Sequence, residues 1–203
     1  MRRPTPKTVR TLAGVAIACA IVLPAFAGPV ADRVRFALTP IDSQPTTQQL
    51  NLVHNNNEQE ALDNLQEIAL GDDTVDTGVK LRAVRALTQY CKAPCGTHEA
   101  HGTLVQLIGL PEYRDARAGR DLLVLRATIE AIGVLRVVDD MNLLLPFLQH
   151  PSRDIRSATA HALRDLGNTQ AITPLRTRYL VEDVPQVQNA LSDALRVLGQ
   201  PIQ

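Results

Sequence analysis

A pattern of 13 residues recurs along this sequence, and it constrains the fold more than any other feature. The clearest copy spans residues 155–167 (IRSATAHALRDLG), and a close counterpart spans residues 187–199 (VQNALSDALRVLG). Looser copies span residues 79–91 and 124–136, and a faint one spans residues 57–69. Repetition of this kind indicates similar structural units that stack on one another.

Each copy has the spacing of a helix with one buried face. Apolar or small residues stand at positions 1, 4, 8, 9 and 12, and these positions share one side of a helix. In the clearest copy they are Ile155, Ala158, Ala162, Leu163 and Leu166. Position 8 is alanine in four copies, which lets a neighbouring helix approach closely at no cost in helix propensity. The four alanines are Ala86, Ala131, Ala162 and Ala194.

A second helix is expected after each of the better copies. Pro146 and Pro174 occur in similar surroundings after two of them, and we place both near a helix N-terminus, where proline is tolerated. Gly167 closes one copy, as a left-handed residue at a helix end does, and Ser152 or Asp154 can cap its start. The starts of the four better copies lie 45, 31 and 32 residues apart. Two helices with their turns fill about 30 residues, so the spacing predicts a solenoid.

These residues resemble HEAT repeats, and more closely the short HEAT-like repeats of the phycobilisome lyases. The resemblance rests on DIRSA at 154–158, AL at 162–163 and LG at 166–167, and on the same order of residue types in the copy at 187–199. It implies an all-α fold, a short right-handed α-solenoid of about four to five antiparallel helix pairs.

The resemblance also implies where the copies lie. The first helix of each pair is expected on the convex side and the second on the concave side. Asp154 and Arg156 stand at the family's turn-cap and inter-repeat ladder positions, while Gln188 replaces the arginine expected in the last copy.

Residues 1–27 have the features of a secretory signal peptide. Four basic residues precede a short apolar run at 12–23, and an Ala-Phe-Ala sequence ends at Ala27. We expect cleavage after Ala27 and export to the periplasm or the cell exterior. The run is short for a membrane span of about 20 residues, so we expect no stable span after cleavage, with a retained anchor as the alternative. The segment Ala16-Ile17-Ala18-Cys19 is a poor lipoprotein box, because its first position lacks the usual larger aliphatic residue, so we expect no lipid on Cys19.

The remaining chain divides into a linker and one domain. Residues 28–46 are rich in Pro, Ser, Thr and Gln near their end and are predicted to be a flexible linker, and residues 47–203 form the predicted repeat domain. Four of the 21 basic residues and none of the 21 acidic ones lie in the signal segment, so the mature chain carries a formal charge of −4. This charge and the absence of Trp argue against a nucleic-acid partner.

One local cluster carries candidate chemistry. Cys91 and Cys95 are the two cysteines that remain after signal cleavage, and Pro94 favours a turn between them. In an oxidising compartment a disulfide is expected. Two alternatives stay open: a zinc site that adds His98 and His101, at unusual ligand spacing, and a redox pair, although three residues separate the cysteines instead of two.

The other polar residues give no catalytic signature. His54, His150 and His161 are isolated, and we expect them on the solvated surface. Asp139 and Asp140 are expected to cap a helix start. The sequence contains no nucleophile elbow, phosphate loop or metalloprotease motif, so we expect neither an enzyme nor a cofactor.

We therefore expect an exported helical-repeat scaffold that binds another protein, of a kind that the sequence does not identify. The predicted interaction surface lies on the face of the second helices, beside the loop at 114–120, and comprises Gln149, Arg176, Arg178 and Tyr179. The alternative for these arginines is simple solvation. Two other functions stay open: an accessory subunit or lyase-like factor of an enzyme complex, implied by the resemblance, and a periplasmic redox- or metal-responsive factor that uses Cys91 and Cys95.

Overall fold

A computed structural model of the chain describes residues 30–39, 44–72 and 74–199. The predicted signal peptide lies outside the described residues. Within them the regular elements are all helices, and no strand occurs. The predicted all-α fold is confirmed. Among these same residues, no helix combines the length and the apolar character needed to cross a membrane.

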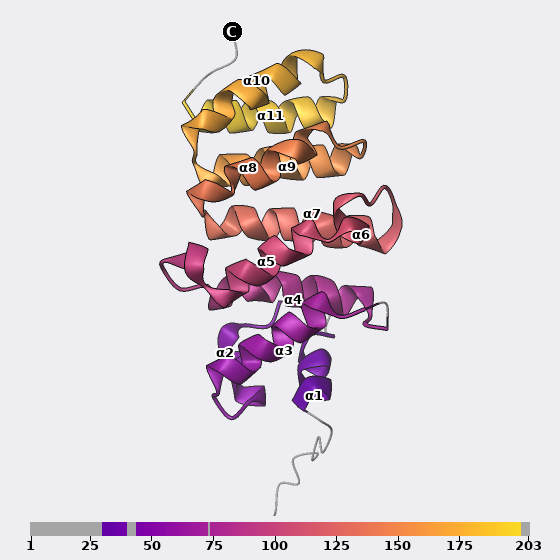
Figure 1. Cartoon of the computed structure of the whole chain (residues 1–203), viewed down its shortest axis with the longest axis vertical. Helices are drawn as coiled ribbons and strands as arrows, with labels where there is room; N and C mark the ends of the chain where they lie inside the picture. The colour runs from indigo at the N-terminus through magenta and orange to yellow at the C-terminus, as the bar shows by residue number, and fades with distance from the viewer. Residues whose placement is uncertain (1–29, 40–43, 73, 200–203) are drawn as a thin grey trace, which may run out of the picture.

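The helices form two stacked rows (Figure 1). One row, which we call the copy row, holds four of the 13-residue copies: α4 (Thr77–Tyr90), α7 (Gly119–Leu135), α9 (Arg153–Leu166) and α11 (Pro185–Val197). The other, the intervening row, contains α3 (Glu58–Leu70), α5 (Glu99–Gly109), α8 (Met141–Leu144) with its 3-10 continuation η3 (Leu145–Gln149), and α10 (Ile172–Val181). Neighbours within the copy row pack side by side, including α9 against α11. The chain is therefore an α-solenoid, as predicted.

The phase of the helix pairs differs from the prediction. Each intervening helix packs chiefly against the copy helix that follows it, so that α10 contacts α11 and η3 contacts α9. Each copy is therefore the second helix of its pair, not the first. The faint copy at 57–69 is not equivalent to the other four copies, so that prediction is wrong. The helix that contains it, α3, lies in the intervening row and contacts α5. A helical spacing shows which face is buried, but not which neighbour covers it.

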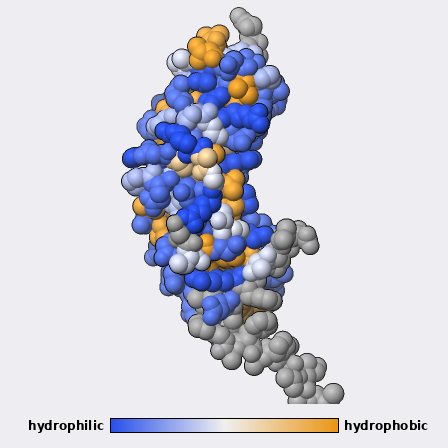
Figure 2. Space-filling view, turned by 90° about the vertical axis from the view of Figure 1, so that its right-hand side faces the viewer, coloured by the Kyte–Doolittle hydropathy of each residue, from blue (hydrophilic) through white to orange (hydrophobic). Residues whose placement is uncertain are grey.

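This phase also reverses the predicted sides of the solenoid. Figure 2 views the body from the right-hand side of Figure 1, and its outline bows outward along the intervening row and is hollowed along the copy row. The prediction that the copies lie on the convex side is therefore wrong. The implied placement of second helices on the concave side holds once the copies are counted as second helices.

Part of the predicted linker at 28–46 is helical, which corrects that prediction. Helix α1 (Val30–Ala37) packs against α2 (Thr47–Val53) and α3. Val34 and Leu38 are fully buried, and they stand one helical turn apart. The apolar residues one turn apart favour a helix at the start of the segment, although the end of the segment has the polar composition of a linker. Helix α2 begins after a capping box, in which the Thr46 side chain accepts from the backbone N–H of Gln49.

Small residues set the close approach of helices in the copy row. The four alanines at position 8 are buried, with exposed fractions of at most 3%. Gly133 of α7 lies against Ala162 of α9, and a Cβ placed on Gly133 would stand 2.7 Å from the Cα of Ala162. The predicted role of small residues in helix packing is therefore confirmed at the contact between α7 and α9.

The helix ends agree with the sequence in part. Gly167 ends α9 in the left-handed conformation, with φ +72°, and Pro174 lies in the first turn of α10. Pro146 instead is the second residue of the 3-10 segment η3, after α8 has ended. The predicted cap by Ser152 or Asp154 is wrong: Ser152 stands at the N-cap of α9 without a side-chain cap bond, and Asp154 contacts Arg153 and Gln186.

Candidate interaction surfaces

A groove of about 590 Å³ crosses α7, α9 and α11 on the hollowed side of the solenoid, and we call it the copy-row groove. Two of the residues that line it, Ala158 and Ala190, are buried alanines. Its other lining residues are polar or charged by type and come from all three helices: Arg126, Glu130, Asp154, Ser157, His161, Gln186, Asn189 and Asp193. The stripe of each copy that faces away from the intervening row therefore contributes to one continuous surface.

Charges in the copy-row groove are largely paired with one another. Arg126 Nε contacts Glu130 Oε1 at 2.8 Å along one face of α7. Asp193 accepts from Arg164 at 2.6 Å and from Arg196 at 2.5 Å, and the bond from Arg164 above all lowers the pKa of the Asp193 carboxyl. Opposite charges that satisfy each other leave the groove polar without a strong net sign.

A buried ion pair joins α9 to the loop that precedes α11. Arg156 donates to both carboxylate oxygens of Glu182 at 2.8 Å, and the Glu182 side chain is fully buried. Arg178 adds bonds of 3.0 and 2.7 Å to the same carboxylate. These contacts, those of Arg156 first, lower the pKa of Glu182 to about 2. Bidentate arginine contacts of this kind fix geometry as well as charge.

Arg156 also anchors the loop in front of its own helix. Its Nη1 donates to the backbone carbonyls of His150 and Pro151, both at 2.9 Å. Gln188, at the same position of the next copy, donates to the backbone carbonyl of Glu182 at 2.5 Å. Each of these side chains therefore reaches a carbonyl six residues before it. The ladder role implied for Arg156 agrees with these contacts, and Gln188 makes the equivalent loop contact without the charge.

The same position contributes a buried lysine near the N-terminal end. Lys80 of α4 is buried, and its ammonium donates to the backbone carbonyl of Gly71 and, at 2.9 Å, to the hydroxyl of Tyr113. Leu125 occupies the position in α7 and is fully buried. The sequence analysis missed Lys80, although its place directly after the first residue of the copy marks it as the counterpart of Arg156.

The predicted surface on the intervening row is brought together only in part. Gln149 accepts from Arg178 at 2.9 Å, so these two residues are in contact. Arg178 is committed to Glu182 and is largely buried, and Tyr179 packs partly buried against the core. Arg176 is exposed. Truncating Arg178 therefore removes internal bonds, whereas Arg176 and Gln149 remain predicted contact residues.

Comparison with known proteins fits this geometry. Residues 116–196, which contain α7 through most of α11, match the sequence model of HEAT repeats. Residues 116–196 are HEAT repeats. The whole fold is similar to a solved structure of the complex of CpcE and CpcF of phycocyanin lyase from Nostoc sp. PCC7120, with a TM-score of 0.54 and 18% sequence identity over 88% of this chain and 69% of that chain. At this identity the likeness shows the fold. No curated protein sequence matches the chain.

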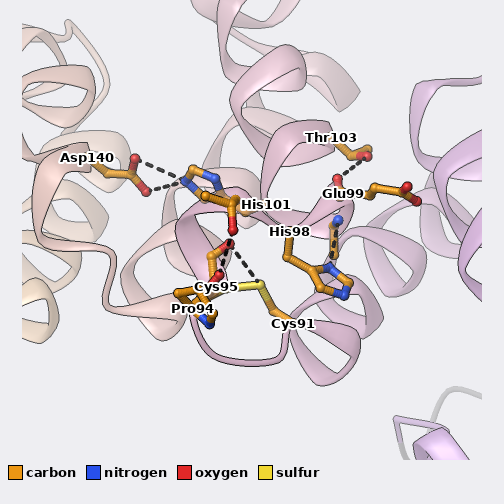
Figure 3. Close-up of a disulfide and its surroundings, with 10 residues drawn as sticks. Cys91, Pro94, Cys95, His98, Glu99, His101, Thr103 and Asp140 are labelled. Atoms are coloured by element: carbon orange, nitrogen blue, oxygen red, sulfur yellow. Dashed lines mark hydrogen bonds and ion pairs between the residues drawn. A yellow bond between two sulfur atoms is a disulfide. The ribbon is translucent and has the colours of Figure 1, made fainter.

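The cysteine loop precedes the HEAT repeats in sequence. Cys91 follows the last residue of α4 and Cys95 opens the 3-10 turn η1 (Cys95–Thr97). Their Cα atoms are 5.4 Å apart, within the range that a disulfide bridges, and Figure 3 shows the two sulfur atoms bonded. The structure therefore brings the two predicted cysteines together as a close pair, and their oxidation in the mature chain stays a prediction.

The two histidines of this loop have separate partners. His98 accepts from the backbone N–H of Ala100 and caps α5, while His101 points toward Asp140, with His101 Nε2 and Asp140 Oδ2 2.8 Å apart (Figure 3). Within the described residues, no three His, Cys, Asp or Glu side chains are placed to share a metal ion. The four ligands of the alternative zinc site therefore do not converge on one point.

Asp140 differs from its prediction. It was expected to cap a helix start, but its side chain makes no cap bond and instead forms a buried pair with His101. The pair connects α5 with the start of α8, and both residues are at most 8% exposed. Because 39 residues separate the two partners, no local pattern in the sequence indicated their contact.

Two of the three isolated histidines are buried, so their predicted surface location is wrong. His54 is 2% exposed and His150 is 5% exposed, whereas His161 is partly exposed in the copy-row groove. His150 Nε2 lies 2.8 Å from the carbonyl of Ala116, and its Nδ1 accepts from the backbone of Ser152. Burial lowers the pKa of His150. The loop residues Ala116 and Ser152 thus hold the His150 ring in its buried position.

A second pocket of about 430 Å³ opens on the intervening row, and we call it the Arg117 pocket. It lies between the end of α5, the loop around residues 114–117 and η3. Its polar lining includes Arg114, Arg117 and Gln149, and its apolar lining includes Leu143, Pro146 and Phe147. The loop at 114–120 therefore does lie beside the predicted contact residue Gln149.

Proposed function

We propose that this protein is an exported HEAT-repeat scaffold that binds another protein through its copy-row groove. The observation that supports this best is the groove itself, which continues across three helices of the HEAT segment on the hollowed side. Solenoid repeats present extended surfaces of this kind to their partners.

The character of the groove favours a protein as the partner. Small-molecule sites are enclosed, mostly apolar pockets with a few polar groups, whereas this groove is open and eight of its ten lining residues are polar or charged. Nucleic acid requires clustered basic residues, and here Arg126 and Arg164 are neutralised by Glu130 and Asp193. A protein surface with its own hydrogen-bonding groups and charges can pair with the polar lining residues and does not require a strongly basic groove.

Replacing Asn189 with arginine is expected to reduce capture of the partner at least about tenfold, equivalent to about 1.4 kcal/mol of binding free energy. Asn189 is exposed on the groove wall, and within the described part of the chain its side chain makes no hydrogen bond that the change would break. The measurement is affinity capture from a native envelope fraction with the tagged mature chain, read by quantitative mass spectrometry.

The matched control is Gln106→Arg, which makes the same kind of change on an exposed position of α5 in the intervening row. We expect its captured proteins to equal those of the wild type. Capture that is equal for both variants and the wild type would show that the copy-row groove is not the docking surface.

Export predicts an oxidised cysteine pair and a processed N-terminus. Chain isolated from an exporting host under non-reducing conditions should begin at Gly28 and weigh about 2 Da less than the reduced chain, because a disulfide forms with loss of two hydrogen atoms. Intact-mass spectrometry before and after reduction measures both. Retained residues 1–27 together with free thiols at Cys91 and Cys95 would overturn the proposed location.

A further inference from the structure

We propose that the Arg117 pocket binds the carboxyl terminus of a peptide whose last side chain is apolar. This inference rests on the proposed scaffold function, since the peptide is the end of a partner protein's chain. The pocket lies on the opposite row from the copy-row groove, so it constitutes a second contact site with its own chemistry.

The size and the apolar wall of the pocket suit one side chain with its terminal peptide unit. Its volume of about 430 Å³ falls within the range of about 300 to 1,000 Å³ that ligand sites occupy. Leu143, Pro146 and Phe147 come from α8 and η3, and Ile108 comes from the end of α5. These four residues supply much of the apolar lining of the pocket.

Arg117 supplies a positive charge that makes no direct ion pair within the described part of the chain, since the Asp115 carboxylate, whose charge also acts on it, is bonded to Arg114. Among the described residues, no carboxylate lies within ion-pair distance of its guanidinium. Its Nη1 lies 3.4 Å from the carbonyl oxygen of Ala116 and 3.2 Å from Nε2 of His150. That nitrogen of His150 lies 2.8 Å from the same carbonyl, and its Nδ1 accepts from Ser152. His150 therefore carries its proton on Nε2 and has no lone pair to offer Arg117.

Gln149 and Arg114 complete the donor side. The side-chain oxygen of Gln149 accepts from Arg178, so its amide NH2 group remains available to donate. Arg114 is paired with Asp115, at 2.9 Å between Nη2 and Oδ2. Two guanidinium groups thus face one carboxylate, and the pocket carries one positive charge in excess.

These features together select the ligand. A carboxylate binds a guanidinium in a planar, bidentate arrangement, and the α-carboxylate of a peptide is attached directly to the carbon that bears the last side chain. An apolar side chain there can contact Phe147 while the carboxylate meets Arg117. An inorganic anion matches only the charge and leaves the apolar wall of the pocket exposed to water.

The test is a titration of the mature full chain with fluorescein-labelled hexapeptides, measured by fluorescence anisotropy. Gly-Ser-Gly-Ser-Gly-Leu with a free carboxyl terminus is expected to bind at least tenfold more tightly than the same peptide with a terminal amide, and more tightly than a peptide that ends in serine. Arg117→Gln is expected to weaken binding of the free acid at least tenfold.

A second variant keeps the test informative if Arg117→Gln perturbs the loop. Gln149→Glu replaces the donating amide with a carboxylate, which Arg178 can still contact, and it should also weaken the free acid by repelling its charge. Arg153→Gln is the matched control, because Arg153 is exposed and does not line the pocket. Its affinity for the peptide should equal that of the wild type.

Three results would overturn the inference: equal affinities for the acid and the amide, no effect of either pocket variant, or displacement of the bound labelled peptide by octanoate at lower concentrations than the unlabelled peptide acid requires. The last result would identify a free fatty acid as the ligand. Because partner capture through the copy-row groove depends on Asn189, capture that survives a failed peptide titration refutes the pocket alone. Partner capture that is unchanged by Asn189→Arg, together with a successful peptide titration, refutes the copy-row groove alone.

Discussion

Replacing Glu182 with glutamine is expected to lower the free energy of unfolding by about 3 to 5 kcal/mol, the cost of leaving one partner of a buried ion pair uncompensated. The carboxylate of Glu182 accepts from both Arg156 and Arg178, and its side chain is fully buried. The neutral amide of glutamine cannot balance the charge of Arg156. Its NH2 group would also face an N–H donor of Arg156, where the carboxylate oxygen now accepts. Urea unfolding at pH 7, followed by circular dichroism, measures the change.

The control for this change is an exposed pair. Arg126→Ala removes the contact with Glu130 on the surface of α7, and exposed pairs of this spacing contribute about 0.3 to 0.5 kcal/mol. A loss for Glu182→Gln no larger than the loss for Arg126→Ala would show that the junction between α9 and the loop before α11 does not depend on this ion pair.

The same pair predicts how stability depends on pH. The pKa of Glu182 is lowered from 4.5 to about 2 in the folded chain. A lowered carboxyl pKa contributes stability that is fully present above the unfolded value and is lost as the pH falls through the folded value. The wild-type chain should therefore lose stability between about pH 4.5 and pH 2 more steeply than Glu182→Gln. Parallel pH curves for the two chains would contradict the assignment.

The fold could be predicted because its determinants are local and repeated. Position 8 of each copy is a buried alanine, and Gly167 and Pro174 mark helix ends that the structure reproduces. The phase of the pairs could not be predicted this way. Two successive helices are joined by short turns on both sides, and nothing in the spacing of α9 shows that it packs on η3 before it instead of α10 after it.

Among the polar contacts too, those at repeated positions could be predicted, whereas those between residues distant in the sequence could not. Arg156 was identified because it occupies a position in a repeated pattern. Its partner Glu182 and the pair of His101 with Asp140 connect residues 26 and 39 positions apart, and each of these partners stands outside the 13-residue copies. Their contacts arise only when one repeat stacks on the next, so they depend on the packing that the sequence pattern predicts but does not detail.

Replacing Gly133 with alanine is expected to lower the free energy of unfolding by about 1 to 3 kcal/mol, the usual cost of overpacking. A glycine inside a helix normally gains about 0.5 to 1 kcal/mol from this change. At Gly133 the new Cβ would stand 2.7 Å from the Cα and 2.9 Å from the Cβ of Ala162. The Cα and Cβ of Ala162 are fixed by the backbone of α9. They can therefore move away from the new methyl group only if α7 and α9 separate.

Gly102 offers the matched comparison for this effect. It lies inside α5, is exposed, and has no neighbouring atom within 4 Å of an added Cβ. Gly102→Ala is therefore expected to stabilise the chain by about 0.5 to 1 kcal/mol, opposite in sign to Gly133→Ala, in the same urea measurement. Stabilisation by both changes would mean that α7 and α9 are not held in backbone contact. The close stacking of copies that defines the concave face would then need another cause.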